Sequence, residues 1–237
     1  MNSIAVIGAT GSLGLVVSRL CAVSSQTVSL LLVDEDEEQL RILQKDFEHR
    51  SIEIRTGADL TLKELYACDI IHWCAPLSVV VRYQIQNSRS KTLSIFHDSA
   101  MSSSQRAIDR LSLSNACAVH MLMNEPKTVV IDTHSPHVTE IESHLKALSL
   151  SPVKLSVDEH DSLMAKSQSM IALLCSEYLE ELTEYSEKKL LTPSGEELLH
   201  ALKHRESRWT KSTLDSLLGN PMLEKTLTQL VNKLKST

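Results

Sequence analysis

The stretch Ser3-Ile-Ala-Val-Ile-Gly8-Ala-Thr-Gly11-Ser-Leu-Gly14 decides the fold of this chain. Residues 3–7 are a short apolar run, and residues 13–23 have the apolar spacing of a helix. A turn with three glycines between a strand and a helix is typical of dinucleotide-binding proteins. Gly8 and Gly11 permit the tight turn and a close approach to a pyrophosphate, and Gly14 lets the helix lie close to the strand.

The start of this helix is a predicted phosphate site, because its free N–H groups and its dipole favour an anion. Asp34 lies 20 residues beyond Gly14, at the end of the second apolar run. A carboxylate there accepts both ribose hydroxyls and repels a 2′-phosphate, which favours NAD over NADP. Arg41 and Arg55 are the residues that could moderate this preference. The predicted cofactor-binding residues of this region are Gly8, Thr10, Gly11, Ser12, Leu13, Gly14 and Asp34.

The first two-thirds of the chain alternate β-rich runs with helical patterns. This alternation predicts a Rossmann-type doubly wound sheet, mostly parallel, with helices on both faces. Residues 1–157 form the predicted dinucleotide-binding domain. The expected strands are residues 3–7, 28–34, 52–55, 69–74, 93–98, 116–121, 128–133 and 153–157.

The pattern changes near Asp158, because β-rich runs disappear and helical spacing continues to the end. We expect residues 158–237 to form a small helical domain that serves substrate binding and dimerisation. Its first helix is predicted over residues 160–182, with Met164, Ser167, Ile171, Leu174 and Tyr178 on one face. About 80 residues are few for independent folding, so the apolar faces are expected to pack on the first domain or on a second copy.

Composition excludes several classes of protein. Apolar residues make up 42% of the 237, which rules out wholesale disorder. A net charge of -6 and only 3% aromatic residues disfavour nucleic-acid binding. The five cysteines form no CxxC pair, so neither a zinc site nor a disulfide framework is predicted. No leader pattern follows Met1 and no apolar run approaches 18 residues, so we expect a soluble cytoplasmic protein without membrane contact.

Polar residues follow the fourth and fifth predicted strands, at the edge where such a sheet binds its ligand. Ala75 and Pro76 come after the fourth strand, where they either contact the nucleotide or only shape the loop. Asp98 and Ser99 come after the fifth, near the expected nicotinamide and substrate. A serine in residues 99–104 could instead cap a helix predicted over residues 105–111.

The order of motifs resembles the prephenate dehydrogenase family, whose members oxidise prephenate or arogenate. Residues 8–14 are similar to its GGxGxxG turn, with Ala9 in place of the second glycine. Residues 69–78 are similar to its fourth strand and the AVP loop that follows, and residues 96–99 resemble the strand that leads to its D-x-x-S-x-K segment. Residues 118–124 lie where the family has its HPMFGP segment. Residues 157–165 are similar to its EHDxxMA helix start, and residues 219–223 to its late DPxLY turn.

This resemblance implies the catalytic residues. His120 matches the histidine that takes the proton from the ring hydroxyl of the substrate, and imidazole has a suitable pKa for a general base. Ser99 matches the motif serine. The resemblance also implies NAD as cofactor, a homodimer, and arginines in the helical domain for the substrate carboxylates. The substrate-binding candidates are Arg205, Arg208 and Gln168.

The chain departs from the family at several positions. Met101 and the serines 102–104 replace the family's lysine, Met121 replaces the proline after the catalytic histidine, and Ala172 replaces a second histidine. The sequence therefore supports binding of the NAD cofactor better than it supports prephenate as the substrate. Two alternatives therefore stay open. One is a non-catalytic or substrate-diverged NAD-binding protein, and the other is an atypical short-chain dehydrogenase with Tyr185 and Lys189 as its YxxxK pair.

Overall fold

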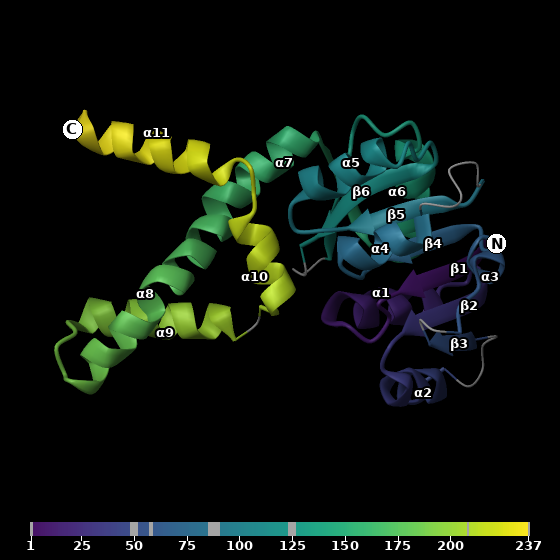
Figure 1. Ribbon diagram of the computed structural model, residues 1–237, viewed down its shortest axis with the longest axis horizontal. Helices are drawn as coiled ribbons and strands as arrows, with labels where there is room; N and C mark the ends of the chain where they lie inside the picture. The colour runs from purple at the N-terminus through teal and green to yellow at the C-terminus, as the bar shows by residue number, and fades with distance from the viewer. Residues whose placement is uncertain are drawn as a thin grey trace. The chain divides into compact units, whose positions relative to one another are not determined.

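Eight strands form one sheet in a computed structural model that describes residues 2–47, 52–56, 59–84, 91–122, 127–207 and 209–236 (Figure 1). The strand order is β3-β2-β1-β4-β5-β6-β7-β8, and each neighbouring pair is parallel except the antiparallel pair β6–β7. The predicted doubly wound, mostly parallel sheet is thus confirmed. The strands are β1 (Asn2–Ile7), β2 (Thr27–Asp34), β3 (Ile52–Thr56), β4 (Ile70–Trp73), β5 (Leu93–His97), β6 (Ala116–Met121), β7 (Thr128–Asp132) and β8 (Ser151–Leu155).

Helices cover both faces of the sheet, and each face has its own buried apolar cluster. Alternation along the strands divides the side chains: Ile4 and Val6 of β1 belong to one cluster, and Ala5 and Ile7 to the other. The first cluster contains side chains of α1 (Ser12–Val23), α2 (Glu37–Lys45) and α6 (Val138–Ala147). The second contains side chains of α3 (Leu62–Leu65), α4 (Leu77–Gln84) and α5 (Met101–Arg110).

Short polar side chains fix where several helices begin. Asp36 caps α2 by accepting a hydrogen bond from the N–H of Gln39 at 3.0 Å. Thr61 and Glu64 form a reciprocal capping box at the start of α3. These caps satisfy N–H groups that a helix leaves without partners, and each contributes about 1 kcal/mol.

The helix after β5 begins earlier than predicted. It starts at Met101, so residues 102–104 lie inside its first turn rather than before it. No serine caps this helix among the described residues; its N-cap is Ala100, whose N–H donates to Asp98 Oδ1 at 3.3 Å. The serine-cap prediction is therefore wrong, because the helix begins before residues 102–104 and its N-cap residue is an alanine.

Contacts divide the chain into two compact units, Met1–Val157 and Asp158–Thr237. The described part of the second unit is helical, and α9 packs against α8 within it. The helix that begins this region is α7 (Val157–Met164). It is followed by η1 (Ala165–Ser169), α8 (Met170–Glu187), α9 (Pro193–Glu206), α10 (Lys211–Leu218) and α11 (Leu223–Lys235). No helix in the described ranges is both long enough and apolar enough to cross a membrane.

A π-helical turn, η1, interrupts the helix predicted over residues 160–182. Such a turn holds one residue more than an α-turn, and it shifts the buried face of everything after it. Ser169, Ala172 and Cys175 are buried, whereas Ser167 and Tyr178 are exposed. The predicted face is therefore wrong at Ser167 and Tyr178, whereas Met164 is buried and Ile171 and Leu174 are half-buried.

Candidate active site

The candidate site lies at one edge of the sheet in the first unit. Strands β1, β2, β4, β5 and β6 run parallel, so their carboxyl ends meet at this edge, where open α/β sheets bind their ligands. The order β2-β1-β4 places the reversal of connectivity between β1 and β4. The edge brings together the predicted residues Gly8, Thr10, Gly11, Ser12, Leu13, Gly14, Asp34, Ala75, Pro76, Asp98, Ser99 and His120.

The three glycines of the turn differ in how much space surrounds them. Gly8 has a φ of +79°, and a Cβ there would lie 2.9 Å from the backbone of Cys74 and Ala75. A Cβ on Gly14 would lie 1.8 Å from the carbonyl oxygen of Gly8. Gly11 differs, because a Cβ there would meet only the Gly8 oxygen, at an ordinary 3.5 Å. The protein's own packing therefore requires Gly8 and Gly14 but leaves open space at Gly11.

Gly11 is the N-cap of α1, and no described side chain caps this helix. Its first turn, which contains Ser12, Leu13 and Gly14, also has no acidic residue. A helix start without a side-chain cap and without an acidic residue in its own first turn is suited to bind an anion. The space beside Gly11 and the uncapped helix start together fit a pyrophosphate, so the residues present fit a dinucleotide.

Asp34 ends β2 and is bonded to the glycine turn. Its Oδ2 accepts a hydrogen bond from the N–H of Thr10 at 2.9 Å, and its Oδ1 accepts one from the N–H of Glu35 at 2.7 Å. These bonds hold the carboxylate at the sheet edge, where a ribose would lie.

The two arginines that could favour a 2′-phosphate already have carboxylate partners. Arg41 pairs with Glu37, and this hydrogen bond raises the pKa of the guanidinium. Arg55 contacts Glu53 and Glu64.

The loops after β4, β5 and β6 complete the edge. Pro76 precedes α4, and its carbonyl accepts from the N–H of Val79 at 2.9 Å, so this proline at least shapes the loop. The N–H of Asp98 donates to the carbonyl of Val119 at 3.1 Å, which ties the end of β5 to β6. Ser99 is half-buried in the bend that follows. His120 is buried and lies on the face of β6 that carries Ala118.

The remaining candidates belong to the second unit or lie outside the described residues. Gln168 is half-buried within η1, and Arg205 is exposed in the last turn of α9. Arg208 lies outside the described residues. Tyr185 is exposed on α8 and donates to Glu181 at 2.7 Å. This bond raises the pKa of the Tyr185 hydroxyl, which opposes activation as a catalytic acid or base.

Three buried histidines that the sequence did not predict to be neighbours form a hydrogen-bonded chain. His97 Nε2 lies 2.9 Å from His72 Nδ1, and His72 Nε2 lies 2.9 Å from His144 Nε2. Burial lowers the pKa of His97 to about 3 and that of His144 to about 4, and it holds the pKa of His72 well below its usual range. The rings are therefore neutral near pH 7, each with one proton to share. The alternation in β4 and β5 could have placed His72 and His97 on one face, but nothing in the sequence links them to α6.

The described residues contain no cluster of metal ligands, and burial keeps two of the thiols protonated. No three His, Cys, Asp or Glu residues in the described ranges converge as metal ligands, and the three histidines bond in a line. Burial raises the pKa of Cys21 to about 12 and that of Cys117 to about 11, so both thiols stay protonated and unreactive.

No family model and no curated protein matches the sequence. Solved structures do match. Prephenate dehydrogenase from Aquifex aeolicus, in complex with hydroxyphenyl propionate and NAD+, has a TM-score of 0.77 at 11% identity, over 100% of this chain and 89% of that one. Arogenate dehydrogenase from Synechocystis has a TM-score of 0.73 at 13% identity, over 99% of this chain and 90% of that one.

A more distant match is pyrroline carboxylate reductase from Plasmodium falciparum with NADP bound, at a TM-score of 0.50 and 13% identity, over 99% of this chain and 91% of that one. At these identities the likeness is one of fold. The resemblance inferred from the sequence motifs is confirmed at that level. The chain has the fold of the prephenate and arogenate dehydrogenases, a Rossmann-type sheet followed by a helical region.

Proposed function

We propose that this chain is a NAD-dependent dehydrogenase of the prephenate or arogenate type. The observation that carries the proposal is the contrast among the glycines. Gly8 and Gly14 are required by packing, whereas Gly11 borders open space at an uncapped helix start. A glycine without a structural reason is explained by a ligand that approaches the backbone there. NAD-bound Aquifex aeolicus prephenate dehydrogenase has the same fold.

In this proposal, different residues at the sheet edge bind different parts of NAD. The N–H groups at the start of α1, beginning at Ser12, hold the pyrophosphate, and Asp34 accepts the hydroxyls of the adenosine ribose. The carboxyl ends of β4 and β5 lie beyond the reversal of strand order, so Ala75, Pro76 and Asp98 border the nicotinamide half. NAD, when bound, accepts a hydride from the substrate carbon.

His120 is the general base of this proposal. A neutral imidazole accepts the proton of the substrate hydroxyl as the carbon is oxidised, and loss of carbon dioxide then leaves an aromatic ring. Burial at the end of β6 keeps water from competing for that proton. In this proposal Ser99, after β5, hydrogen-bonds the same hydroxyl. Gln168, Arg205 and Arg208 are the candidates for holding the substrate carboxylates.

A non-catalytic NAD-binding protein is the second candidate, and two buried positions favour it. Ala172, which replaces the family's second histidine, is fully buried and apolar, and so is Met101, which belongs to the stretch 101–104 that replaces the family's lysine. Neither position can therefore gain a polar substrate contact by a small rearrangement. The short-chain dehydrogenase alternative has less support. Tyr185 bonds to Glu181, and Lys189 lies beyond the end of α8 with a φ of +57°.

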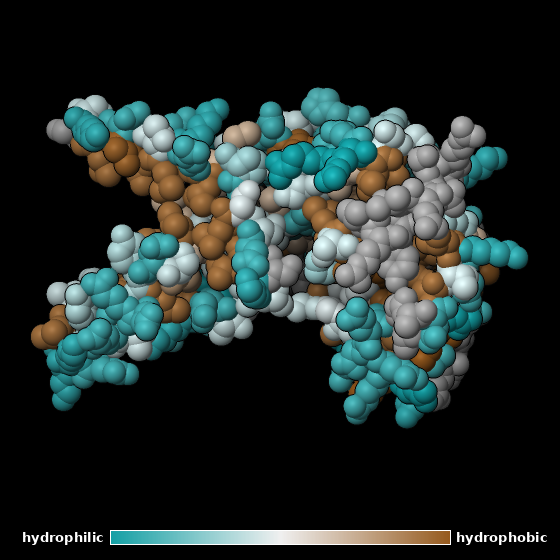
Figure 2. All heavy atoms as spheres, viewed as in Figure 1, coloured by the Kyte–Doolittle hydropathy of each residue, from teal (hydrophilic) through white to brown (hydrophobic). Residues whose placement is uncertain are grey.

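We further propose a cytoplasmic homodimer formed through the helical unit. Leu227, Leu230 and Val231 share one face of α11, and the last two are exposed. Figure 2 shows this apolar surface along α11. Exposed apolar faces of this kind are usually covered by another protein surface.

The deciding experiment offers the purified protein NAD or NADP with prephenate or arogenate and follows the nicotinamide absorbance. NAD binding by calorimetry is measured in parallel. Turnover with either substrate supports the dehydrogenase. NAD binding without turnover supports the second candidate, and absence of NAD binding contradicts both.

A further inference from the structure

Arg55 lies on β3, the strand next to the one that ends at Asp34. Strands β2 and β3 are parallel, with Val33 paired to Arg55 and Asp34 paired to Thr56. Arg55 is therefore one residue from the partner of the ribose-binding aspartate, and adjacent strands are only about 4.8 Å apart. An arginine near the adenosine ribose accommodates the 2′-phosphate in NADP-binding proteins of this fold.

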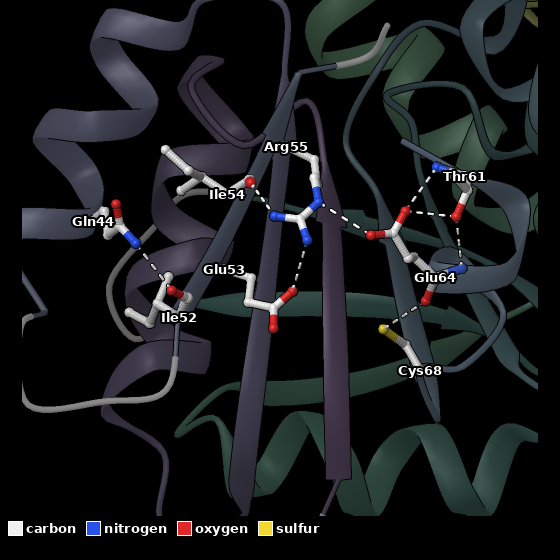
Figure 3. A network of polar contacts seen from close by, with 8 residues as sticks. All are labelled: Gln44, Ile52, Glu53, Ile54, Arg55, Thr61, Glu64 and Cys68. Atoms are coloured by element: carbon white, nitrogen blue, oxygen red, sulfur yellow. Dashed lines mark hydrogen bonds and ion pairs between the residues drawn. The ribbon is translucent and has the colours of Figure 1, made fainter. Parts of the chain in front are cut away.

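The guanidinium of Arg55 is already occupied on three sides (Figure 3). Its Nε donates to Glu64 Oε1 at 3.2 Å, its Nη1 to the carbonyl of Ile54 at 2.9 Å, and its Nη2 to Glu53 Oε2 at 3.3 Å. Glu64 is the less exposed of the two carboxylates, so it does more than the solvent-screened Glu53 to offset the positive charge that would attract a phosphate.

Glu64 is the better-held of the two carboxylates. Its Oε2 accepts from the N–H of Thr61 at 3.0 Å and from the Thr61 hydroxyl, and its own N–H donates back to Thr61 Oγ1 at 3.2 Å. These bonds from Thr61, followed by the contact with Arg55, lower the pKa of the Glu64 carboxyl. Glu53 is two-thirds exposed, and no other described residue is seen to hold it. The capping box thus orients an ionised Glu64 toward the arginine.

We propose that Glu64 is a specificity determinant: it withholds Arg55 from a 2′-phosphate and so enforces NAD over NADP together with Asp34. The inference rests on the proposed cofactor site. Asp34 acts by repelling the phosphate, and Glu64 acts by occupying the cation that would attract it. Loss of the Glu64 charge leaves Arg55 able to form charge-assisted hydrogen bonds with a phosphate.

Glu64→Gln tests this role without disturbing the helix start, because glutamine also completes a capping box. Calorimetry measures the affinities of NAD and NADP in an Asp34→Ala background, where the repulsion is absent. We expect Glu64→Gln to tighten NADP binding about tenfold, the equivalent of one hydrogen bond to a charged group, with NAD affinity changed less than twofold. Adding Arg55→Ala should abolish the gain.

Glu53→Gln is the matched control, because it removes the other carboxylate from the same guanidinium. It should leave NADP affinity nearly unchanged. An equal gain with Glu53→Gln, or no gain with Glu64→Gln, would overturn the assignment to Glu64 while the NAD site remained. Failure of the unmodified protein to bind NAD would instead refute the proposed function. Circular dichroism of each variant confirms that differences in affinity arise in a folded protein.

Discussion

The side chain of Asp34 and the backbone of Thr10 are joined by a 2.9 Å hydrogen bond, which links the end of β2 to the glycine turn. The same carboxylate accepts from the N–H of Glu35, so both of its oxygens are oriented before any ligand arrives. Orientation of this kind reduces the entropy lost when a ribose binds. In the proposed site, Asp34 therefore both shapes the turn and binds the ribose.

Replacing Asp34 by alanine should relax the preference for NAD. The repulsion of a 2′-phosphate disappears, while the ribose of NAD loses its acceptor. We expect the ratio of the NADP to the NAD dissociation constant, measured by calorimetry, to fall at least about tenfold, one charge-assisted hydrogen bond being worth that much. Asp36→Ser removes a neighbouring charge but keeps the helix cap, so it should leave the ratio unchanged. The ribose role would be wrong if both variants gave the original ratio.

Substitutions at Gly11 and Gly14 should separate binding from folding. Gly11→Val places its side chain in the open space beside the helix start, so NAD binding should be lost with little change in stability. Gly14→Ala forces a Cβ toward the Gly8 carbonyl and should cost at least about 1–3 kcal/mol of unfolding free energy. Urea titrations and NAD calorimetry on both variants measure the two effects. Normal NAD affinity in Gly11→Val would refute the pyrophosphate site.

His120→Asn should lower kcat by ~10²–10⁴, the usual contribution of a general base. NAD affinity should hardly change, because the imidazole faces the substrate in this proposal. The rate of the unmodified enzyme should fall at acidic pH, since only the neutral ring accepts a proton. Tyr185→Phe is the control and should be silent. A fully active His120→Asn enzyme would eliminate the catalytic assignment and leave the cofactor site intact.

Acid should destabilise the protein through the three buried histidines. Folding keeps His97 and His144 neutral down to a pH of about 3 and about 4, whereas the unfolded chain protonates them below about 6.5. These histidines therefore leave the free energy of unfolding unchanged above about pH 6.5 and lower it as the pH falls toward 4, because only the unfolded chain takes up the protons. Each group alone would account for about 2 kcal/mol between pH 7 and pH 5.

Urea titrations at the two pH values measure this loss. His144→Leu should reduce it, whereas His134→Gln, at an exposed position, should not. Identical pH dependence in His144→Leu and the unmodified protein would show that the chain of histidines is not the acid-sensitive element.

Charge introduced on α11 should prevent dimer formation. Val231→Glu places a carboxylate in the apolar face that also contains Leu227 and Leu230. Light scattering at micromolar concentration should give the mass of a dimer for the unmodified protein and of a monomer for this variant. Gln229→Glu adds the same charge on the opposite side of the helix and should remain dimeric. A monomeric unmodified protein would refute the proposal.

The strands of the sheet could be predicted because each is encoded by a short, continuous stretch of sequence. The runs that became β1, β2 and β4–β6 are short, apolar and punctuated, and the glycine turn sets the order of the first helix and strand. The antiparallel β7 also had a signal: only residues 122–127 separate it from β6, too few for a parallel crossover.

The rest depended on contacts between distant residues. The extra residue of η1 leaves no mark in apolar periodicity, so the buried face after Met164 could not be placed. The restraint of Arg55 needed the side chain of Glu64, nine residues away on another element. His144 is separated from its partner His72 by 72 residues, and only the packing of α6 on the sheet brings the two rings together.

The bond between His72 and His144 also sets the rotation of α6. Ile141 and Leu145 pack on the sheet through contacts without direction, so a turn of the helix about its axis would exchange one apolar contact for another. The bond to His72 has a direction and a length. A rotation by one residue, about 100°, would leave buried ring nitrogens without partners, at about 1–3 kcal/mol each. The three histidines therefore fix α6 in one orientation about its axis. This helix follows β7, whose Val130 pairs with His120 of β6.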